Sequence, residues 1–240
     1  AYCAMVRPVP LCIPSGALQG KTCIVTGCNT GIGLETARAL AAGGARVVFA
    51  CRNEAKARAA MQRLLQEAGG SMVEDHLVFL PLDVSSLKSV RRFAELVEER
   101  KIEVHSLILN AGVILRNRAL SEDGFEMTMA SNHFGHFALV QLLLPNLLRT
   151  ESKGEQPRIV IVGSNIGYYR SRFDFSEVVA ARDEQERAAF QAKPYSLFGI
   201  YGLSKMANYL FGAELARRLH AKGSKIATSC VHPGDVNTEV

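Results

Sequence analysis

The chain has 240 residues, of which 48% are apolar and 21% are charged, and its formal net charge is +5. This composition is that of an ordinary globular protein and excludes a disordered or fibrous one. The charge is mild, and the basic residues form no run with interleaved aromatic residues, which excludes a typical nucleic-acid-binding protein. The length lies near the upper end for one domain with a single core.

Six cysteines stand at positions 3, 12, 23, 28, 51 and 230. None forms a C-x-x-C pair, and no histidine lies at a zinc-like spacing from two of them, so we expect no metal site. Cys23 and Cys51 lie in or beside apolar runs. We therefore interpret the cysteines as free thiols in a reducing, cytoplasmic compartment, with a disulfide framework as the alternative.

The N-terminal residues 1–19 carry three of the eight prolines and show no periodicity, which predicts an arm or linker before a domain at residues 20–240. No apolar run approaches the ~20 residues of a membrane span. Residues 9–18 are too short and too interrupted by proline for the apolar core of a signal peptide. Because the chain begins with Ala1 rather than Met, an upstream anchor or targeting segment stays compatible with the sequence.

From Lys21 onward, short runs rich in Val, Ile and Leu alternate with longer helical patterns. The runs are residues 21–27, 45–51, 76–83, 104–112, 158–164 and 225–234. Runs so uniformly apolar are typical of strands buried on both faces, which means a parallel sheet with helices on both sides. The pattern predicts an α/β protein with a single doubly wound domain of the Rossmann type and no internal boundary.

The stretches between the runs are amphipathic. Residues 54–70 end in a glycine pair that suits a helix C-cap, and residues 84–101 begin with Ser85 or Ser86 as the N-cap. Residues 165–198 are more polar and irregular, with a short helix expected at 182–190. This region is long enough to be a functional loop.

The segment at residues 26–33, TGCNTGIG, directly follows the first apolar run and opens a helical pattern. Gly27 permits a tight turn, Gly31 lets the backbone approach a pyrophosphate, and Gly33 lets helix and strand pack closely. A helix N-terminus at this position supplies free N–H donors and the positive end of a dipole. The segment predicts nucleotide binding, but not a nucleoside triphosphate loop, because no Gly-Lys-Ser/Thr follows.

Three further strand ends carry candidate cofactor-binding residues. Arg52 follows the second run, where an NAD site usually has an acidic residue; a guanidinium can pair with a 2′-phosphate, which predicts NADP(H) rather than NAD(H). The alternative is a surface arginine. Asp83 closes the third run and is expected either to accept a hydrogen bond from the adenine amino group or to cap the next helix. Asn110, Ala111 and Gly112 close the fourth run and line the crevice.

Tyr201 and Lys205 are four residues apart in a helical pattern and therefore lie on one face. A free tyrosine has a pKa near ~10, and an ammonium beside it favours the tyrosinate. Such a tyrosine can exchange a proton with a substrate oxygen. The spacing alone is common, but Ser164 is expected at the carboxyl end of the fifth strand, on the same rim as the glycine loop. A hydroxyl there can hydrogen-bond a carbonyl oxygen.

The ordered set of motifs resembles the short-chain dehydrogenase/reductase family. The matching pieces are TGCNTGIG, Asp83-Val84, Asn110-Ala111-Gly112, Asn132, Ser164, YGLSK at 201–205 and HPGDVNT at 232–238. They extend over almost the whole chain. The amino-acid sequence of residues 123–137 and 201–211 is most similar to that of the retinol-dehydrogenase-like branch and its plant relatives, which include protochlorophyllide reductases.

The resemblance implies a role for each matching residue. Tyr201 is the general acid/base, Lys205 holds the nicotinamide ribose and tunes Tyr201, Ser164 orients the substrate carbonyl, and Asn132 holds a water in a proton relay. Pro233, Gly234, Val236 and Thr238 lie near the nicotinamide end, and His133 and His136 are packing residues rather than metal ligands. The full cofactor-binding set is Gly27, Asn29, Thr30, Gly31, Ile32, Gly33, Arg52, Asp83, Val84, Asn110, Ala111, Gly112, Tyr201, Lys205, Pro233, Gly234, Val236 and Thr238.

The sequence departs from the family pattern in four places. Leu109 replaces the first of two asparagines, and Gly163 precedes a single serine where relatives often have two. The glycine loop contains no basic residue, which weakens the expectation of NADP(H). Family members also continue beyond the 232–238 motif, so we expect the native chain to be longer at its C-terminus, with part of the substrate pocket and a common dimer surface there.

The sequence therefore predicts an NADP(H)-dependent oxidoreductase that transfers a hydride between a nicotinamide and a carbonyl or alcohol carbon. The alternative is a catalytically silent NADP(H)-binding regulator or scaffold of the same fold. A small carbonyl or alcohol substrate is expected, and the aromatic residues and arginines of 165–175 fit a bulky apolar one. A homodimer is among the assemblies that the resemblance allows.

Overall fold

The computed structural model describes residues 13–70, 72–169, 178, 183–234 and 236. Most of the N-terminal arm predicted at residues 1–19 lies outside this part of the chain. So does Thr238, and so do residues 170–177 of the irregular region.

One six-stranded parallel sheet forms the centre of the described chain, with the strand order β3-β2-β1-β4-β5-β6. Each strand lies within one of the apolar runs found in the sequence. The strands are β1 (Thr22–Thr26), β2 (Arg46–Cys51), β3 (Leu77–Pro81), β4 (Ser106–Leu109), β5 (Arg158–Val162) and β6 (Ala227–Val231). This order reverses direction between β1 and β4, which places a crevice at the carboxyl ends of those strands. The doubly wound Rossmann-type fold predicted from the sequence is confirmed.

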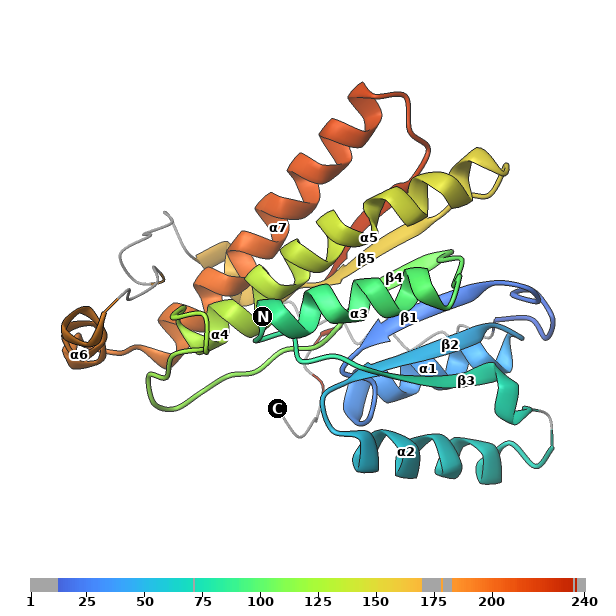
Figure 1. Cartoon of the computed structure of the whole chain (residues 1–240), viewed down its shortest axis with the longest axis horizontal. Helices are drawn as coiled ribbons and strands as arrows, with labels where there is room; N and C mark the ends of the chain where they lie inside the picture. Colours follow the sequence, from blue (N-terminus) through green and yellow to red (C-terminus); the bar gives the residue numbers. More distant parts are fainter. Residues whose placement is uncertain (1–12, 71, 170–177, 179–182, 235, 237–240) are drawn as a thin grey trace, which may run out of the picture.

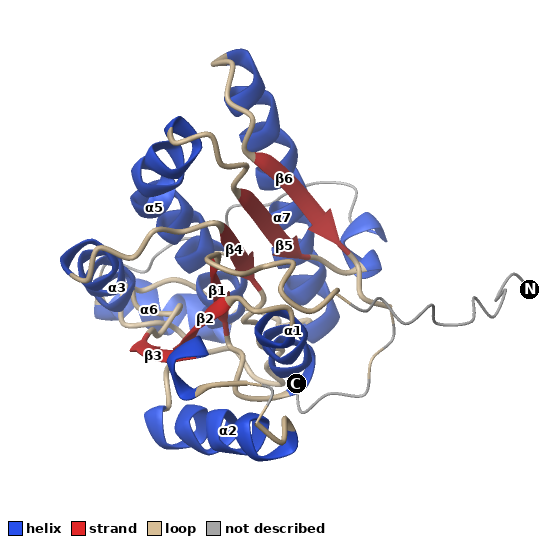
Figure 2. Cartoon of the chain, turned by 90° about the vertical axis from the view of Figure 1, so that its right-hand side faces the viewer, coloured by secondary structure: helices blue, strands red, loops and turns tan. Residues whose placement is uncertain are grey.

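Helices cover both faces of the sheet, as Figures 1 and 2 show. The helices are α1 (Gly31–Ala42), α2 (Glu54–Glu67), α3 (Leu87–Glu99), α4 (Met127–Met129), α5 (Gly135–Ser152), α6 (Glu184–Ala192) and α7 (Leu197–Ala221). Short 3₁₀ turns lie at η1 (Glu74–His76) and η3 (Asn165–Tyr169), and a π-turn, η2 (Ala130–Phe134), joins α4 to α5. Successive strand residues point to opposite faces, so Ile24 and Leu107 pack with α3, α5 and α7, whereas Val25 and Ile108 pack with α1 and α2.

Side-chain caps fix where most of the longer helices begin. Asn53 caps α2, Ser86 caps α3, Asp183 caps α6 and Ser196 caps α7, each accepting a hydrogen bond from a backbone N–H one turn later. Of the two serines proposed for the start of α3, Ser86 is therefore the N-cap. Thr30 precedes α1 but makes no side-chain cap, and the first turn of α1 holds no acidic residue.

The last strand departs furthest from the uniform burial expected for all six, and β3 and β5 are also buried only in part. In β6, Ala227, Ser229 and Val231 are exposed and the two residues between them are half-buried. The reason is that α1 and α2 cover the other side of the sheet over β1 to β3, while α7 packs β6 from one side. Within the described residues, no helix combines the length and the hydropathy that a membrane crossing requires.

Candidate active site

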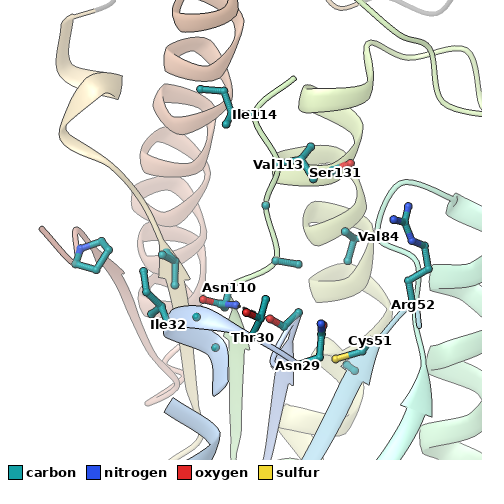
Figure 3. Close-up of a pocket in the computed structure, with 18 of the residues that line it drawn as sticks. Asn29, Thr30, Ile32, Cys51, Arg52, Val84, Asn110, Val113, Ile114 and Ser131 are labelled. Carbon is teal, nitrogen blue, oxygen red and sulfur yellow. Dashed lines mark hydrogen bonds between the residues drawn. The ribbon is translucent and has the colours of Figure 1, made fainter. Parts of the chain in front are cut away.

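The carboxyl ends of the strands open into a cavity of about 630 Å³, which Figure 3 shows from close by. Its volume is that of a typical small-molecule site. Nearly all of the residues predicted from the sequence line it: Gly27, Asn29, Thr30, Gly31, Ile32, Gly33, Arg52, Asp83, Val84, Asn110, Ala111, Gly112, Ser164, Tyr201, Lys205, Pro233, Gly234 and Val236. Asn132 is buried next to the cavity but does not line it, and Thr238 is outside the described part of the chain.

The glycine loop turns sharply between β1 and α1. Gly27 and Gly31 have φ values of 64° and 56°, in the region where glycine is favoured. A Cβ atom on Gly33 would lie 2.5 Å from Nδ2 of Asn110, so this position leaves no space for a side chain. The first N–H groups of α1, which carry no side-chain cap, therefore meet the cavity where Gly31, Ile32 and Gly33 line it.

This loop fits the pyrophosphate of a dinucleotide. The free N–H groups and positive end of α1 suit an anion, and the absence of an acidic residue in its first turn leaves that potential uncancelled. The end of β4 holds the loop from the other side. Nδ2 of Asn110 donates to the backbone oxygens of Thr26 at 2.9 Å and Gly27 at 3.2 Å.

Arg52 and Asp83 form an ion pair at the end of β2, with Nη1 of Arg52 3.7 Å from Oδ2 of Asp83. Arg52 is exposed and Asp83 is half-buried. The other carboxylate oxygen of Asp83 accepts hydrogen bonds from the N–H and the hydroxyl of Ser85, at 2.9 and 2.6 Å. Asp83 therefore orders the turn before α3 without being its N-cap.

Lys56 lines the cavity too, and the sequence did not indicate it because it lies in the first turn of α2, beyond the strand-end motif.

Asn132 sits fully buried in the π-turn η2, and its side chain ties two segments together. Its Oδ1 accepts from the N–H of Val113 at 2.7 Å, and its Nδ2 donates to the oxygen of Val113 and to Oγ of Ser204, both at 3.0 Å. A Cβ on Gly112 would lie 3.3 Å from Oδ1 of Asn132 and 3.8 Å from Nζ of Lys205. Asn132 and Lys205 thus approach the same point from different helices.

Behind Asn132 lies a fully buried histidine that links β1 to the π-turn. Nδ1 of His136 is 3.2 Å from the oxygen of Asn132, and Nε2 is 2.9 Å from Oγ1 of Thr26. A carbonyl only accepts, so Nδ1 carries the proton and Nε2 accepts from the Thr26 hydroxyl. That hydroxyl in turn accepts the N–H groups of Asn110 and Ala111, both at 2.9 Å. Burial lowers the pKa of His136 to about 3, so the ring is neutral.

Tyr201 and Lys205 lie one turn apart near the start of α7, and both line the cavity beside Ser164 at the end of β5. Nζ of Lys205 donates to the backbone oxygen of Val162 at 2.9 Å and lies 5.5 Å from the centre of the Tyr201 ring. At Gly163, where relatives often have a second serine, a Cβ would lie 2.8 Å from the ring of Tyr209.

Burial controls the titration of this pair. It raises the pKa of Tyr201 above its ordinary value, with a hydrogen bond to Ser164 acting in the opposite direction. It also lowers the pKa of Lys205 to about 8. The raised pKa of Tyr201 is opposite to the direction expected from a neighbouring ammonium, because the Lys205 ammonium is directed at the end of β5. Tyr201 is thus a protonated acid at neutral pH.

Comparison with known proteins places these features in a family. The family model described as short chain dehydrogenase matches residues 21–175. The chain belongs to the short-chain dehydrogenase family. The match covers the glycine loop, the strand ends at Asp83 and Asn110, Asn132 and Ser164, but stops before Tyr201.

Individual relatives agree with this family and with its retinol-dehydrogenase-like branch. Retinol dehydrogenase 11 of Mus musculus is 40% identical over 232 residues, which are 96% of this chain and 66% of that protein. Retinol dehydrogenase 13 of Homo sapiens is 37% identical over 95% of this chain and 63% of its own length. The chain thus spans slightly less than two thirds of these relatives.

Solved structures share the fold. An uncharacterized protein from Mycobacterium paratuberculosis superposes with a TM-score of 0.72 at 35% identity, covering 92% of this chain and 70% of that one. A complex of Pseudomonas aeruginosa RhlG with NADP superposes with a TM-score of 0.67 at 26% identity, covering 92% and 75%.

Proposed function

We propose that the chain is an NADP(H)-dependent oxidoreductase that interconverts an alcohol and its carbonyl compound. The observation that carries this proposal is that Ser164, Tyr201 and Lys205 line the same cavity as the N-terminus of α1. A nicotinamide dinucleotide held by the glycine loop and the strand ends supplies or accepts the hydride when bound. The side chains of this chain bind the substrate oxygen and transfer the proton.

Tyr201 is proposed to move the proton. In the direction of carbonyl reduction, Ser164 donates a hydrogen bond to the substrate oxygen, and Tyr201 gives its phenolic proton to that oxygen. The raised pKa of Tyr201 keeps the phenol protonated at neutral pH, as this direction requires. Alcohol oxidation needs the tyrosinate, so its rate is expected to increase with pH. Lys205 is cationic below its pKa of about 8 and lines the same cavity, so it is proposed to hold the ribose next to the nicotinamide.

The preference for NADP(H) is supported by charge at the end of β2. Arg52 and Lys56 both line this part of the cavity, so that two cations can meet a 2′-phosphate even though the glycine loop has none. Asp83 pairs with Arg52 and reduces this potential in part. The NADP complex of RhlG supports the same choice by similarity.

The substrate is proposed to be bulky and apolar. Val113, Ile114 and Leu115 form a continuous apolar segment that lines the cavity beyond Gly112. The relatives are named retinol dehydrogenases, so retinol and retinal are the first compounds to test. Alcohols and aldehydes with shorter chains complete the panel.

The decisive experiment replaces Tyr201 with Phe and measures turnover of retinal and of simpler aldehydes with NADPH. Loss of the phenolic proton is expected to reduce kcat by roughly 10²- to 10⁴-fold while NADPH binding stays intact. Tyr209→Phe removes the same atom two turns further along α7, from a residue that does not line the cavity, and should keep wild-type turnover. Wild-type turnover in Tyr201→Phe would refute the mechanism, whereas NADPH binding without turnover of any carbonyl compound would favour a silent regulator.

A further inference from the structure

Two cysteines meet where the glycine loop crosses the end of β2. Sγ of Cys28, in the loop, lies 3.8 Å from Sγ of Cys51, the last residue of β2. Both side chains are buried, but Cys51 lines the cavity, and Figure 3 shows its sulfur directed toward the segment of Asn29. The pair is therefore in its thiol form, within reach of small molecules that enter the proposed cofactor site.

The two thiols have different surroundings. The thiol of Cys28 and the backbone N–H groups of Cys28, Asn29 and Gly27 stabilise the Cys51 thiolate and lower its pKa, although burial opposes this. Burial raises the pKa of Cys28, whose sulfur also lies 3.2 Å from the oxygen of Val25. Because the thiolate is the reactive form, Cys51 is the nucleophile of the pair and Cys28 is the thiol that resolves it.

We propose that Cys28 and Cys51 are a peroxide-sensitive pair that regulates dinucleotide binding, an inference that rests on the proposed function. The Cys51 thiolate attacks one oxygen of hydrogen peroxide, the O–O bond breaks, and Cys51 becomes a sulfenic acid while hydroxide leaves and takes up a proton. The Cys28 sulfur then attacks the Cys51 sulfur and water leaves. Two thiols are oxidised to one disulfide, and one peroxide is reduced to two waters.

The disulfide would change the shape of the glycine loop. A disulfide bond is about 2.0 Å long, so the two sulfurs must approach by nearly half of their present separation. Gly27 has little freedom to follow, because its N–H already bonds to the oxygen of Ala50 at 2.9 Å and a Cβ on it would lie 2.9 Å from Cα of Ala111. The shift must therefore be taken up at Cys28 and the residues after it, which turns the loop N–H groups away from the position that suits an anion.

Binding and oxidation must then affect each other reciprocally. If the disulfide weakens dinucleotide binding, a bound dinucleotide must disfavour the disulfide by the same factor. This reciprocity distinguishes regulation of the site from incidental oxidation elsewhere in the chain.

The test treats the full chain with hydrogen peroxide and measures two quantities. Peptide mapping by mass spectrometry identifies the bond formed and separates Cys28–Cys51 from bonds to the other cysteines. Titration with NADPH then gives the dissociation constant of reduced, oxidised and re-reduced protein. We expect the Cys28–Cys51 bond, at least about tenfold weaker NADPH binding, recovery with dithiothreitol, and slower oxidation when NADPH is present.

Single variants assign the effect to the pair, each compared with itself before and after peroxide. Cys51→Ala should lose the response, and Cys28→Ala should accumulate a sulfenic acid without a disulfide. Cys23→Ala should respond like wild type, because Cys23 is buried in β1 and its pKa is raised to about 11. Free thiols after peroxide, an unchanged NADPH affinity in the disulfide form, or a full response in Cys51→Ala would each overturn the inference. Failure of the reduced wild type to bind NADPH would instead refute the proposed function, and the regulatory inference with it.

Discussion

Nδ2 of Asn132 donates a hydrogen bond to Oγ of Ser204 at 3.0 Å, and Oγ of Ser204 donates to the backbone oxygen of Tyr201 at 2.7 Å. Ser204 is fully buried and lies between the proposed acid and lysine in sequence. Through this hydroxyl, the π-turn before α5 and the first turns of α7 are held in one register. The relative placement of Asn132 and Tyr201 therefore depends on Ser204.

Ser204→Ala should reduce turnover more than cofactor binding. The substitution leaves one N–H of Asn132 buried without its acceptor, although the bond to the oxygen of Val113 remains. We expect kcat to fall by roughly five- to 150-fold, since an unsatisfied buried donor costs about 1–3 kcal/mol. NADPH titration should give a nearly unchanged dissociation constant. Equal losses in binding and turnover would mean that Ser204 only supports the fold.

Arg52→Ala should shift cofactor preference from NADPH toward NADH. The variant loses the cation at the end of β2 and leaves the Asp83 carboxylate unpaired, which repels a 2′-phosphate. NADPH affinity should fall by roughly ten- to hundredfold, the range of a charge-assisted hydrogen bond, while NADH affinity changes little. Arg46→Ala removes the same charge from the other end of β2 and serves as the control. A parallel loss for both cofactors would contradict the assignment of Arg52 to the 2′-phosphate.

His136 should make the fold sensitive to acid. Its folded pKa is depressed to about 3, so the unfolded chain takes up a proton near pH 6.5 while the folded ring stays neutral. Stability from this residue is complete above pH 6.5 and is lost as the pH falls toward 3, by up to about 1.4 kcal/mol per pH unit. Urea unfolding of His136→Asn between pH 7 and pH 4 should show a flatter dependence than wild type. His220→Asn, an exposed site at the end of α7, should keep the wild-type slope.

Lys205→Met should separate activity from stability. The folded pKa of Lys205 is about 8, below the unfolded value of ~10.4. Between these two pH values the unfolded state binds more protons than the folded state. The contribution of Lys205 to wild-type stability therefore increases as the pH rises from 8 to about 10.4. Below pH 8 the buried ammonium carries its full cost. The variant should be inactive yet more stable than wild type at pH 7, by roughly 1–3 kcal/mol after loss of the bond to Val162. This advantage should shrink toward pH 10; a constant or growing advantage would show that Lys205 titrates elsewhere.

Local patterns were sufficient to predict the sheet and most of the cavity wall. Each apolar run became a strand, and the glycine loop and strand ends met at one rim because parallel strands share a direction. Arg52 pairs with Asp83, and Thr26 contacts His136. Both pairs join residues far apart in the sequence, so no sequence spacing could predict these contacts. The direction of the Tyr201 pKa also escaped prediction, because burial at this site acts more strongly than the lysine one turn away.

The chemical groups and the apolar wall of this cavity come from different kinds of structure. Tyr201 and Lys205 stand on a long helix that reaches the main core at Leu215 and Leu219, whereas Val113–Leu115 lie on a segment without regular secondary structure. The wall can accordingly be rebuilt residue by residue at small cost to the fold. For enzyme engineering, this makes positions 113–115 the natural place to redirect the protein to new compounds while the proton-transfer apparatus is retained.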